Sequence, residues 1–234
     1  MGAFRFFLAA VLLAPVFARA DADVTVVVDM SPEGRKVPHP SAEKPAYYLP
    51  VMQGYRQYGD FQAQDNLPTP HDIVHALAPE LAKQNYLVMD GAHPKPDMVI
   101  GFAWGRIAPT DIPNAVNQTQ RYALSLGRTA IDVMPLESYG HAEFMEATRD
   151  ERYFIVVTAY AYGPFVREKK KVILWKAKMS LPSTGYFMAD VVSPLAKAGG
   201  PEFGTETTSH PKLVPAVPVG HVEIGTPVEK KDIP

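Results

Sequence analysis

The fold is decided by a segment that reads YFIVVTAYAYGPFVREKKKVILWKAKMSL, at residues 153–181. Both ends of this segment are rich in β-branched and aromatic residues, a composition typical of strands. Gly163-Pro164 breaks the first run, and the charged residues 167–171 precede the second. Because two strands with so short a connection suit a hairpin, we expect residues 153–162 and 172–181 to pair antiparallel. The charged residues then form its solvated tip.

The second strand of this hairpin also predicts how the sheet is buried. Lys176 and Lys178 alternate with Trp175, Ala177 and Met179. Successive side chains of a strand point to opposite faces, and an antiparallel sheet can keep one face in water. The alternation therefore predicts one buried face and one solvated face.

A helix is well specified near residue 70. Thr69 can cap it, Pro70 suits its first position, and Asp72 places a carboxylate beside the free amides of the first turn. Pro79 lies inside the apolar pattern, where it removes a hydrogen bond, so we expect a kink or a restart there. Asn85 is expected to end the helix in a left-handed conformation.

The remaining chain adds further elements. Strands are predicted at residues 24–28, 86–89 and 98–107, and a second amphipathic helix at residues 185–197. Seven prolines between residues 31 and 70 predict an irregular, Pro-rich excursion with at most short strands. Residues 111–138 are less legible, and a short helix or ragged hairpin is expected at residues 137–149.

These elements predict an α+β fold. We expect a single domain at residues 21–200, with a mixed or mainly antiparallel sheet of about five or six strands packed against two helices. Residues 201–234 carry six prolines and should form an extended tail that is either partly wrapped over the domain or disordered.

The beginning of the sequence, MGAFRFFLAAVLLAPVFARADADV, has the features of a secretory signal peptide. Arg5 precedes an apolar run at residues 6–17, and Ala18-Arg19-Ala20 has the form of a cleavage site. We therefore expect residues 1–20 to be removed and the exported chain to begin at Asp21. The apolar run is too short to span a bilayer, and no later segment is long and apolar enough to do so.

The chain contains no cysteine, which excludes disulfides, thiolate metal sites and lipidation at the cleavage site. An exported domain of this size without disulfides fits a bacterial source, with a periplasmic or extracellular location. Without Arg5 and Arg19 the chain has 21 basic and 25 acidic residues, a formal charge of −4. A nucleic-acid or anionic-membrane role for the protein as a whole would require the opposite sign.

The stretch HDIVH presents His71 and His75 four residues apart, a spacing that holds zinc in His-Glu-x-x-His motifs. Here Asp72 replaces the glutamate that acts as general base, and its position is already explained by the helix start. A catalytic zinc also needs a third protein ligand, and the other histidines stand at no diagnostic spacing. A metal-dependent hydrolase using His71 and His75 is therefore the alternative hypothesis, and exposed helix histidines are the preferred interpretation.

No other motif indicates catalysis. The sequence has no G-x-S-x-G elbow, no S-x-x-K pair and no glycine-rich phosphate loop. Asp150 and Glu151 are interpreted as surface charge before a strand. The sequence thus offers no catalytic residue, no metal ligand and no cofactor, and favours a protein that is not an enzyme.

Aromatic residues are the remaining indication of binding. Five of them cluster in the proline-rich excursion, namely Tyr47, Tyr48, Tyr55, Tyr58 and Phe61. Three more could share a sheet face, namely Tyr160, Tyr162 and Trp175. Such rings can form a platform for a glycan or a partner segment. They can equally cover the sheet as core.

Two segments resemble a family of bacterial envelope proteins catalogued as a domain of unknown function, whose members are often lipoproteins. They read HDIVHALAPELAKQNYLVMDGAHPKPDMVIGFAWG at residues 71–105, and KKVILWKAKMSL followed by GYFMADVVSPLAKAGG at residues 170–200. The resemblance implies an α/β sandwich of a mixed sheet with helices and a location in the envelope. It carries over no catalytic residue, and this chain lacks the lipidation cysteine.

Together these features favour an exported, non-catalytic binding or assembly module of the bacterial periplasm or cell envelope. The expected partner is an envelope protein or a glycan. A further alternative is that the domain is a scaffold whose tail docks into an assembly. Nothing in the sequence indicates the oligomeric state.

Overall fold

A computed structural model describes residues 24–58, 66–91, 95–107 and 151–207 of the chain. The elements are β1 (Thr25–Met30), η1 (Gly34–Lys36), β2 (Ala46–Tyr58), α1 (Pro70–Lys83), β3 (Tyr86–Val88), β4 (Met98–Ile107), β5 (Arg152–Ala161), α4 (Tyr162–Arg167), β6 (Ile173–Pro182), α5 (Met188–Gly199) and η2 (Gly200–Glu202). The predictions for residues 1–20, 111–138 and 137–149, and for the tail beyond residue 207, lie outside the described residues.

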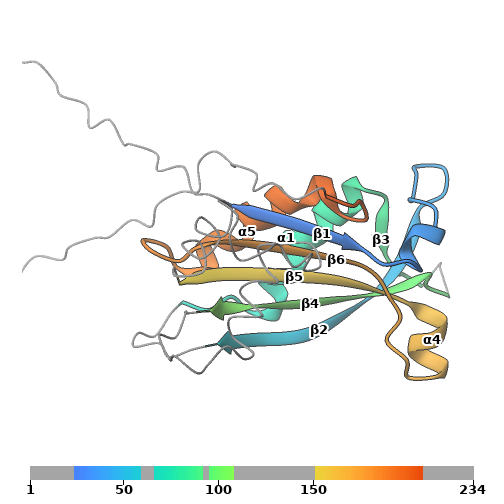
Figure 1. Cartoon of the computed structure of the whole chain (residues 1–234), viewed down its shortest axis with the longest axis horizontal. Helices are drawn as coiled ribbons and strands as arrows, with labels where there is room; N and C mark the ends of the chain where they lie inside the picture. The colour runs from blue at the N-terminus through green and yellow to red at the C-terminus, as the bar shows by residue number, and fades with distance from the viewer. Residues whose placement is uncertain (1–23, 59–65, 92–94, 108–150, 208–234) are drawn as a thin grey trace, which may run out of the picture.

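Six strands form one mixed sheet in the order β1-β6-β5-β4-β2-β3 (Figure 1). The pairs β1/β6, β6/β5 and β5/β4 are antiparallel, whereas β2 runs parallel to both β4 and β3. Helix α1 makes the crossover between β2 and β3 that a parallel connection requires. The predicted α+β class and the mixed sheet are confirmed.

The hairpin at the centre of the sheet is also confirmed. β5 and β6 pair antiparallel from Arg152 opposite Pro182 to Tyr160 opposite Ile173, with a register shift after Ala159. Their connection is more ordered than the predicted tip, because α4 begins where β5 ends. The shape of this connection matters for the candidate site.

Helix α1 begins with the expected cap. The Asp72 amide donates to the Thr69 hydroxyl oxygen at 3.3 Å, and the Thr69 amide donates to the Asp72 carboxylate at 2.8 Å. The helix does not restart at Pro79, because Leu77 and Leu81 on either side of it are fully buried and hold the two turns in one packed unit. Asn85 is left-handed, with φ of 62°, as predicted.

The main correction concerns residues 31–70. β2, the longest described strand with 13 residues, replaces the short strands expected in the Pro-rich excursion. The Tyr48 carbonyl accepts a hydrogen bond from the Met89 amide, so the backbone groups of Tyr48 point toward β3. Those of Pro50, two residues on, point to the same side. Pro50 is tolerated because its missing amide hydrogen faces this side, beyond the end of β3. A bulge between Met52 and Gly54 bends the strand, and Gly54 takes φ of 85° there.

The main hydrophobic core lies between the sheet and the helices α1 and α5. Both helices bury an apolar stripe there, including Leu77 from α1 and Leu195 from α5. These helix residues pack against every second residue of the strands, on the face turned toward the helices. Phe102, Ile155 and Met179 are among these strand residues. We call this side of the sheet its inner face, and the opposite side its outer face.

After α5 the chain turns through η2 and returns along β1. Phe203 is fully buried and stacks on Trp175 with ring centroids 6.0 Å apart. The amide of Val28 in β1 donates to the Thr207 hydroxyl at 2.8 Å, and the Thr207 amide donates back to the Val28 carbonyl. Among the described residues, no helix has the length and apolar character needed to cross a bilayer.

Candidate functional site

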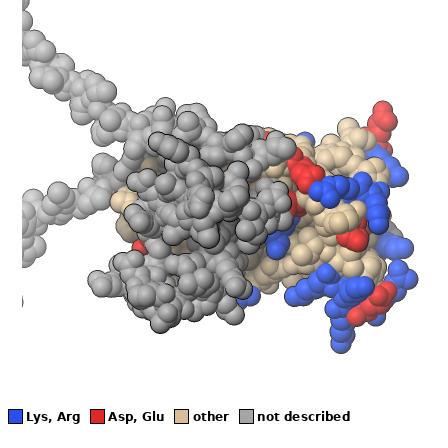
Figure 2. Space-filling model, in the orientation of Figure 1, with Lys and Arg blue, Asp and Glu red and all other residues tan. Residues whose placement is uncertain are grey.

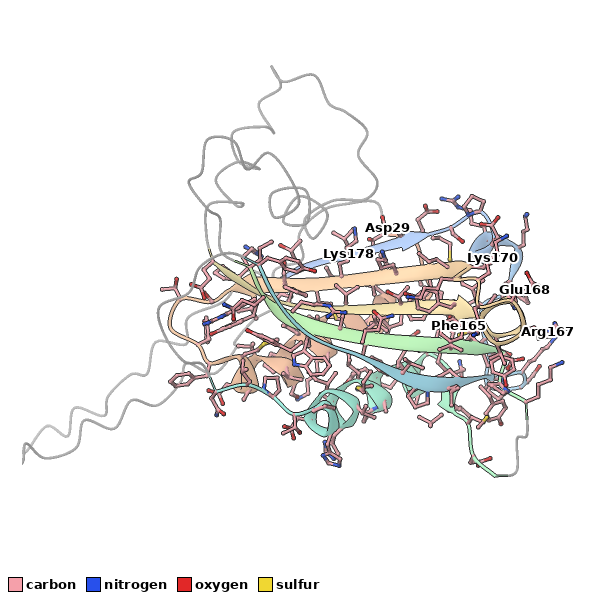
Figure 3. All side chains as sticks on the ribbon, turned by 90° about the horizontal axis from the view of Figure 1, so that it is seen from below. Asp29, Phe165, Arg167, Glu168, Lys170 and Lys178 are labelled. Carbon is pink, nitrogen blue, oxygen red and sulfur yellow. The ribbon has the colours of Figure 1, made fainter. Side chains whose placement is uncertain are left out.

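The outer face of the sheet carries an ion pair between two strands. The ammonium of Lys178 on β6 lies 2.7 Å from a carboxylate oxygen of Asp29 on β1. Figure 3 shows the two side chains on the same side of the sheet. Lys178 is only 5% exposed, so the solvated face predicted from its alternation is wrong. The ammonium can be buried because a carboxylate from a distant part of the chain neutralises it.

Lys176 stands beside this pair and lies within the influence of its carboxylate charge. Its backbone is directly opposite Asp29 in the β1/β6 register. Partial burial, and next the repulsion of the Lys178 charge, lower the pKa of Lys176, while the Asp29 charge raises it. Among the described residues, two ammonium groups and one carboxylate therefore lie close together on this part of the sheet.

Polar contacts continue along the outer face from this group. The Arg152 guanidinium on β5 donates to the hydroxyl of Ser180 at 3.3 Å and to that of Thr25 at 3.2 Å. Further across the sheet the face becomes apolar, with Ile107 and Phe154 almost fully buried and Tyr58 packed against them. The outer face is thus divided between a cationic half and an apolar half.

At one end of the sheet, α4 and the loop after it project from the central hairpin (Figure 1). We call residues 162–171 the basic hook. Its exposed part contains Arg167, Lys169, Lys170 and Lys171 against the single acidic residue Glu168, a net charge of +3. Figure 2 shows lysine and arginine atoms at this end of the molecule, with fewer aspartate and glutamate atoms among them.

The basic hook is anchored to the outer face by aromatic packing. The Phe165 ring lies 5.7 Å from the Tyr160 ring, and the Tyr160 hydroxyl accepts a hydrogen bond from Gln53 at 3.0 Å. In Figure 3, Phe165 lies on the sheet side of α4 and Arg167 on its far side. The hook therefore presents its charges from a fixed base.

The predicted aromatic platforms are not formed. Trp175 is 2% exposed in the inner core, whereas Tyr160 packs under the hook on the outer face. The tyrosines of β2 are divided as well, with Tyr48 and Tyr55 on the inner face and Tyr58 on the outer face. Phe61 lies outside the described residues. The alternation of side chains along a strand explains this separation.

His71 and His75 are brought together, as their spacing predicts. Their rings stack with centroids 5.9 Å apart on the exposed side of α1. The carboxylate of Asp72 is engaged by Thr69, whose hydrogen bonds lower the pKa of Asp72. Within the described ranges no three His, Cys, Asp or Glu side chains gather as a metal site would require.

A small cavity lies beneath η1. It has a volume of about 40 Å³ and is lined in part by Met30, His39, Tyr86 and Trp175. Burial raises the pKa of Tyr86 to about 12, so its hydroxyl stays protonated at neutral pH. Organic ligands occupy pockets of roughly 300–1,000 Å³, so this cavity has room for water only.

Sequence reasoning identified the charged run of the hook but missed Asp29 and Phe165. Asp29 ends the β-branched strand VTVVVD in the same alternation as Val27 and Thr25, which places it on the outer face. Phe165 follows Gly163-Pro164 directly, and a single ring after a break gives no indication of where it packs. The pairing of distant strands was needed to find both.

Comparison with known proteins does not assign the chain to a family. No family model matches it, and no curated protein matches it. Among solved structures, it is similar to a PDZ domain protein from Parabacteroides distasonis, with 10% identity and a TM-score of 0.43 over 83% of this chain and 39% of that one. It is also similar to a PelC dodecamer subunit from Paraburkholderia phytofirmans, with 9% identity and a TM-score of 0.34 over 75% of this chain and 92% of that one. The chain thus spans about two fifths of the first protein, and neither likeness carries a functional argument.

Proposed function

We propose that the protein is an exported, non-catalytic binding module of the bacterial cell envelope, and that it contacts its partner through the basic hook. The observation that carries this proposal is the hook itself. It concentrates a charge of +3 within five residues of a chain whose formal net charge is −2. Charge of one sign gathered at one end of a molecule orients it toward a partner of the opposite sign.

The basic hook is both exposed and ordered, two properties that suit a binding surface. Residues 166–171 are all exposed, although they connect the two central strands of the sheet. The Pro164 carbonyl accepts from the amides of both Glu168 and Lys170 at 3.1 Å, which closes the loop backbone on itself. A preordered loop loses less conformational entropy when it binds.

The test is co-sedimentation of the purified full chain with isolated bacterial envelope fragments at physiological salt. We expect the chain to sediment with the fragments and the variant K169E/K170E/K171E to stay in the supernatant. The matched control is Lys197→Glu, an exposed residue of α5 on the other side of the sheet. Equal sedimentation of all three proteins would show that the basic hook is not the contact surface.

Export is tested separately. A reporter enzyme that is active only outside the cytoplasm, joined after residue 23, should be active in bacteria. Replacing Leu12 and Leu13 with arginine interrupts the apolar run at residues 6–17 and should abolish that activity. Activity that survives this replacement would contradict the proposed location.

A further inference from the structure

The tip of the basic hook combines an exposed apolar side chain with four basic side chains. Val166 is 49% exposed and lies directly before Arg167. Lys169, Lys170 and Lys171 follow after one acidic residue, and all are exposed. Long basic side chains can lay their methylene stems along an apolar surface while their charges reach anionic groups.

The tip is held in one conformation from two sides. On the sheet side, the Phe165 ring packs at a tilt against Tyr160, which is 7% exposed and hydrogen-bonded to Gln53. At the solvent side, Lys169 takes a left-handed conformation with φ of 52°, which turns the chain back toward β6. Figure 3 shows Arg167 and Lys170 at this end of the molecule, and Val166 directly precedes Arg167 in the chain.

We propose that the basic hook docks the protein on the surface of an anionic phospholipid bilayer. This inference rests on the proposed function and names its partner. The hook offers charge and one apolar residue, and the cavity of about 40 Å³ beneath η1 belongs to a different set of residues. Clustered lysine and arginine side chains beside an exposed apolar one suit the surface of an anionic bilayer, which attracts basic segments through its charge.

The size of the effect follows from the charges. Each lysine or arginine near an anionic bilayer strengthens binding about five-fold. Neutralising three lysines of the hook is therefore expected to weaken binding on the order of 100-fold. The attraction acts over roughly 8 Å at physiological ionic strength, so added salt should weaken it too.

The experiment measures binding of the full chain to vesicles of phosphatidylcholine alone and to vesicles with one third phosphatidylglycerol. Every sample carries the same apolar residues 6–17, so the difference between the two vesicles reports on charge. We expect the wild-type chain to prefer the anionic vesicles, and K169Q/K170Q/K171Q to lose that preference. Val166→Ser should weaken binding to the anionic vesicles, and Lys197→Gln should change nothing.

Three results would overturn the inference. They are equal binding to both vesicles, an unchanged preference in the triple variant, and loss of preference in Lys197→Gln. Circular dichroism melting curves that match wild type show that each variant is folded. If envelope fragments bind the chain through the hook but anionic vesicles do not, the bilayer inference fails while the proposed function stands. The partner is then an anionic glycan or an envelope protein.

Discussion

The ammonium of Lys178 lies 2.7 Å from the carboxylate of Asp29 although the two residues are not direct neighbours in the register. Lys178 is opposite Val27, and the residue opposite Asp29 is Lys176. The carboxylate thus reaches diagonally to the more buried of two lysines on β6. This choice follows from burial, because the ammonium with less access to water gains more from a counter-ion.

Asp29→Asn should destabilise the protein by about 2–4 kcal/mol, because it leaves the Lys178 ammonium buried without this carboxylate. Urea denaturation at pH 7 measures the change. The control is Lys197→Gln, an exposed substitution expected within about 0.5 kcal/mol of wild type. A change in Asp29→Asn no larger than in this control would show that the pair contributes little.

Lys176→Gln should stabilise the protein at pH 7, and the gain should shrink as the pH rises toward 10.5. The pKa of Lys176 is lowered in the folded state from 10.5, chiefly by burial, so the unfolded chain binds more protons between the two values. The wild type therefore gains stability as the pH rises through this window, and the variant lacks that gain. Urea midpoints of both proteins from pH 7 to 10.5 test the sign, and a gap that widens with pH would contradict it.

Thr69→Ala should cost about 1 kcal/mol through loss of the helix cap. The substitution should also remove the part of the pH dependence of stability that comes from Asp72. The hydrogen bonds from Thr69 lower the pKa of Asp72, so they contribute stability above pH 3.8 that is lost as the pH falls through the folded value. The stability difference between wild type and variant should therefore decrease below pH 3.8. A difference that is constant between pH 6 and pH 2.5 would show that the cap does not depend on the charge of Asp72.

Gly105→Ala should destabilise the protein by about 3 kcal/mol or more, or prevent folding. A methyl group at Gly105 would overlap the backbone carbonyl of Arg56 on β2, which cannot move without breaking the sheet. Gly91→Ala is the control, because nothing lies within 4 Å of its methyl position. The measurement is thermal unfolding of both variants, and equal melting temperatures would contradict the close approach of β2 and β4.

Zinc should not bind stoichiometrically through His71 and His75. Both rings lie on an exposed helix face, and the described residues place no third ligand beside them. The metal content of the purified full chain, measured by mass spectrometry after dialysis against zinc, tests this expectation. Near-stoichiometric zinc that is lost in His75→Ala would instead support the metal-dependent hydrolase.

The features that could be predicted from the sequence are those determined by residues close together in the chain. The hairpin of β5 and β6, the cap at Thr69 and the left-handed Asn85 each depend on residues close together in the chain. The strand β2 was missed because the seven prolines of residues 31–70 were taken to exclude a long strand, whereas only Pro50 lies within β2. Pro50 is tolerated only because its missing donor points away from β4.

The candidate site was predicted only in part. The charge of residues 167–171 and their place between two strands could be inferred from composition. The burial of Lys178 could not, because its partner Asp29 lies in the first strand and reaches it only through the sheet. Nor could the anchoring of Phe165, since Tyr160 comes under it through the turn of α4.

The position of Pro50 also bears on how the protein avoids aggregation. Along residues 49–58, the edge of β2 turned away from β4 pairs with no other described strand. An exposed edge of that length is a template on which a second chain can add and grow into fibres. Pro50 withholds one donor from this edge, and the bulge at Gly54 twists it out of register with a straight incoming strand. Two residues that interrupt an ideal strand thus oppose the addition of a second chain along this edge of β2.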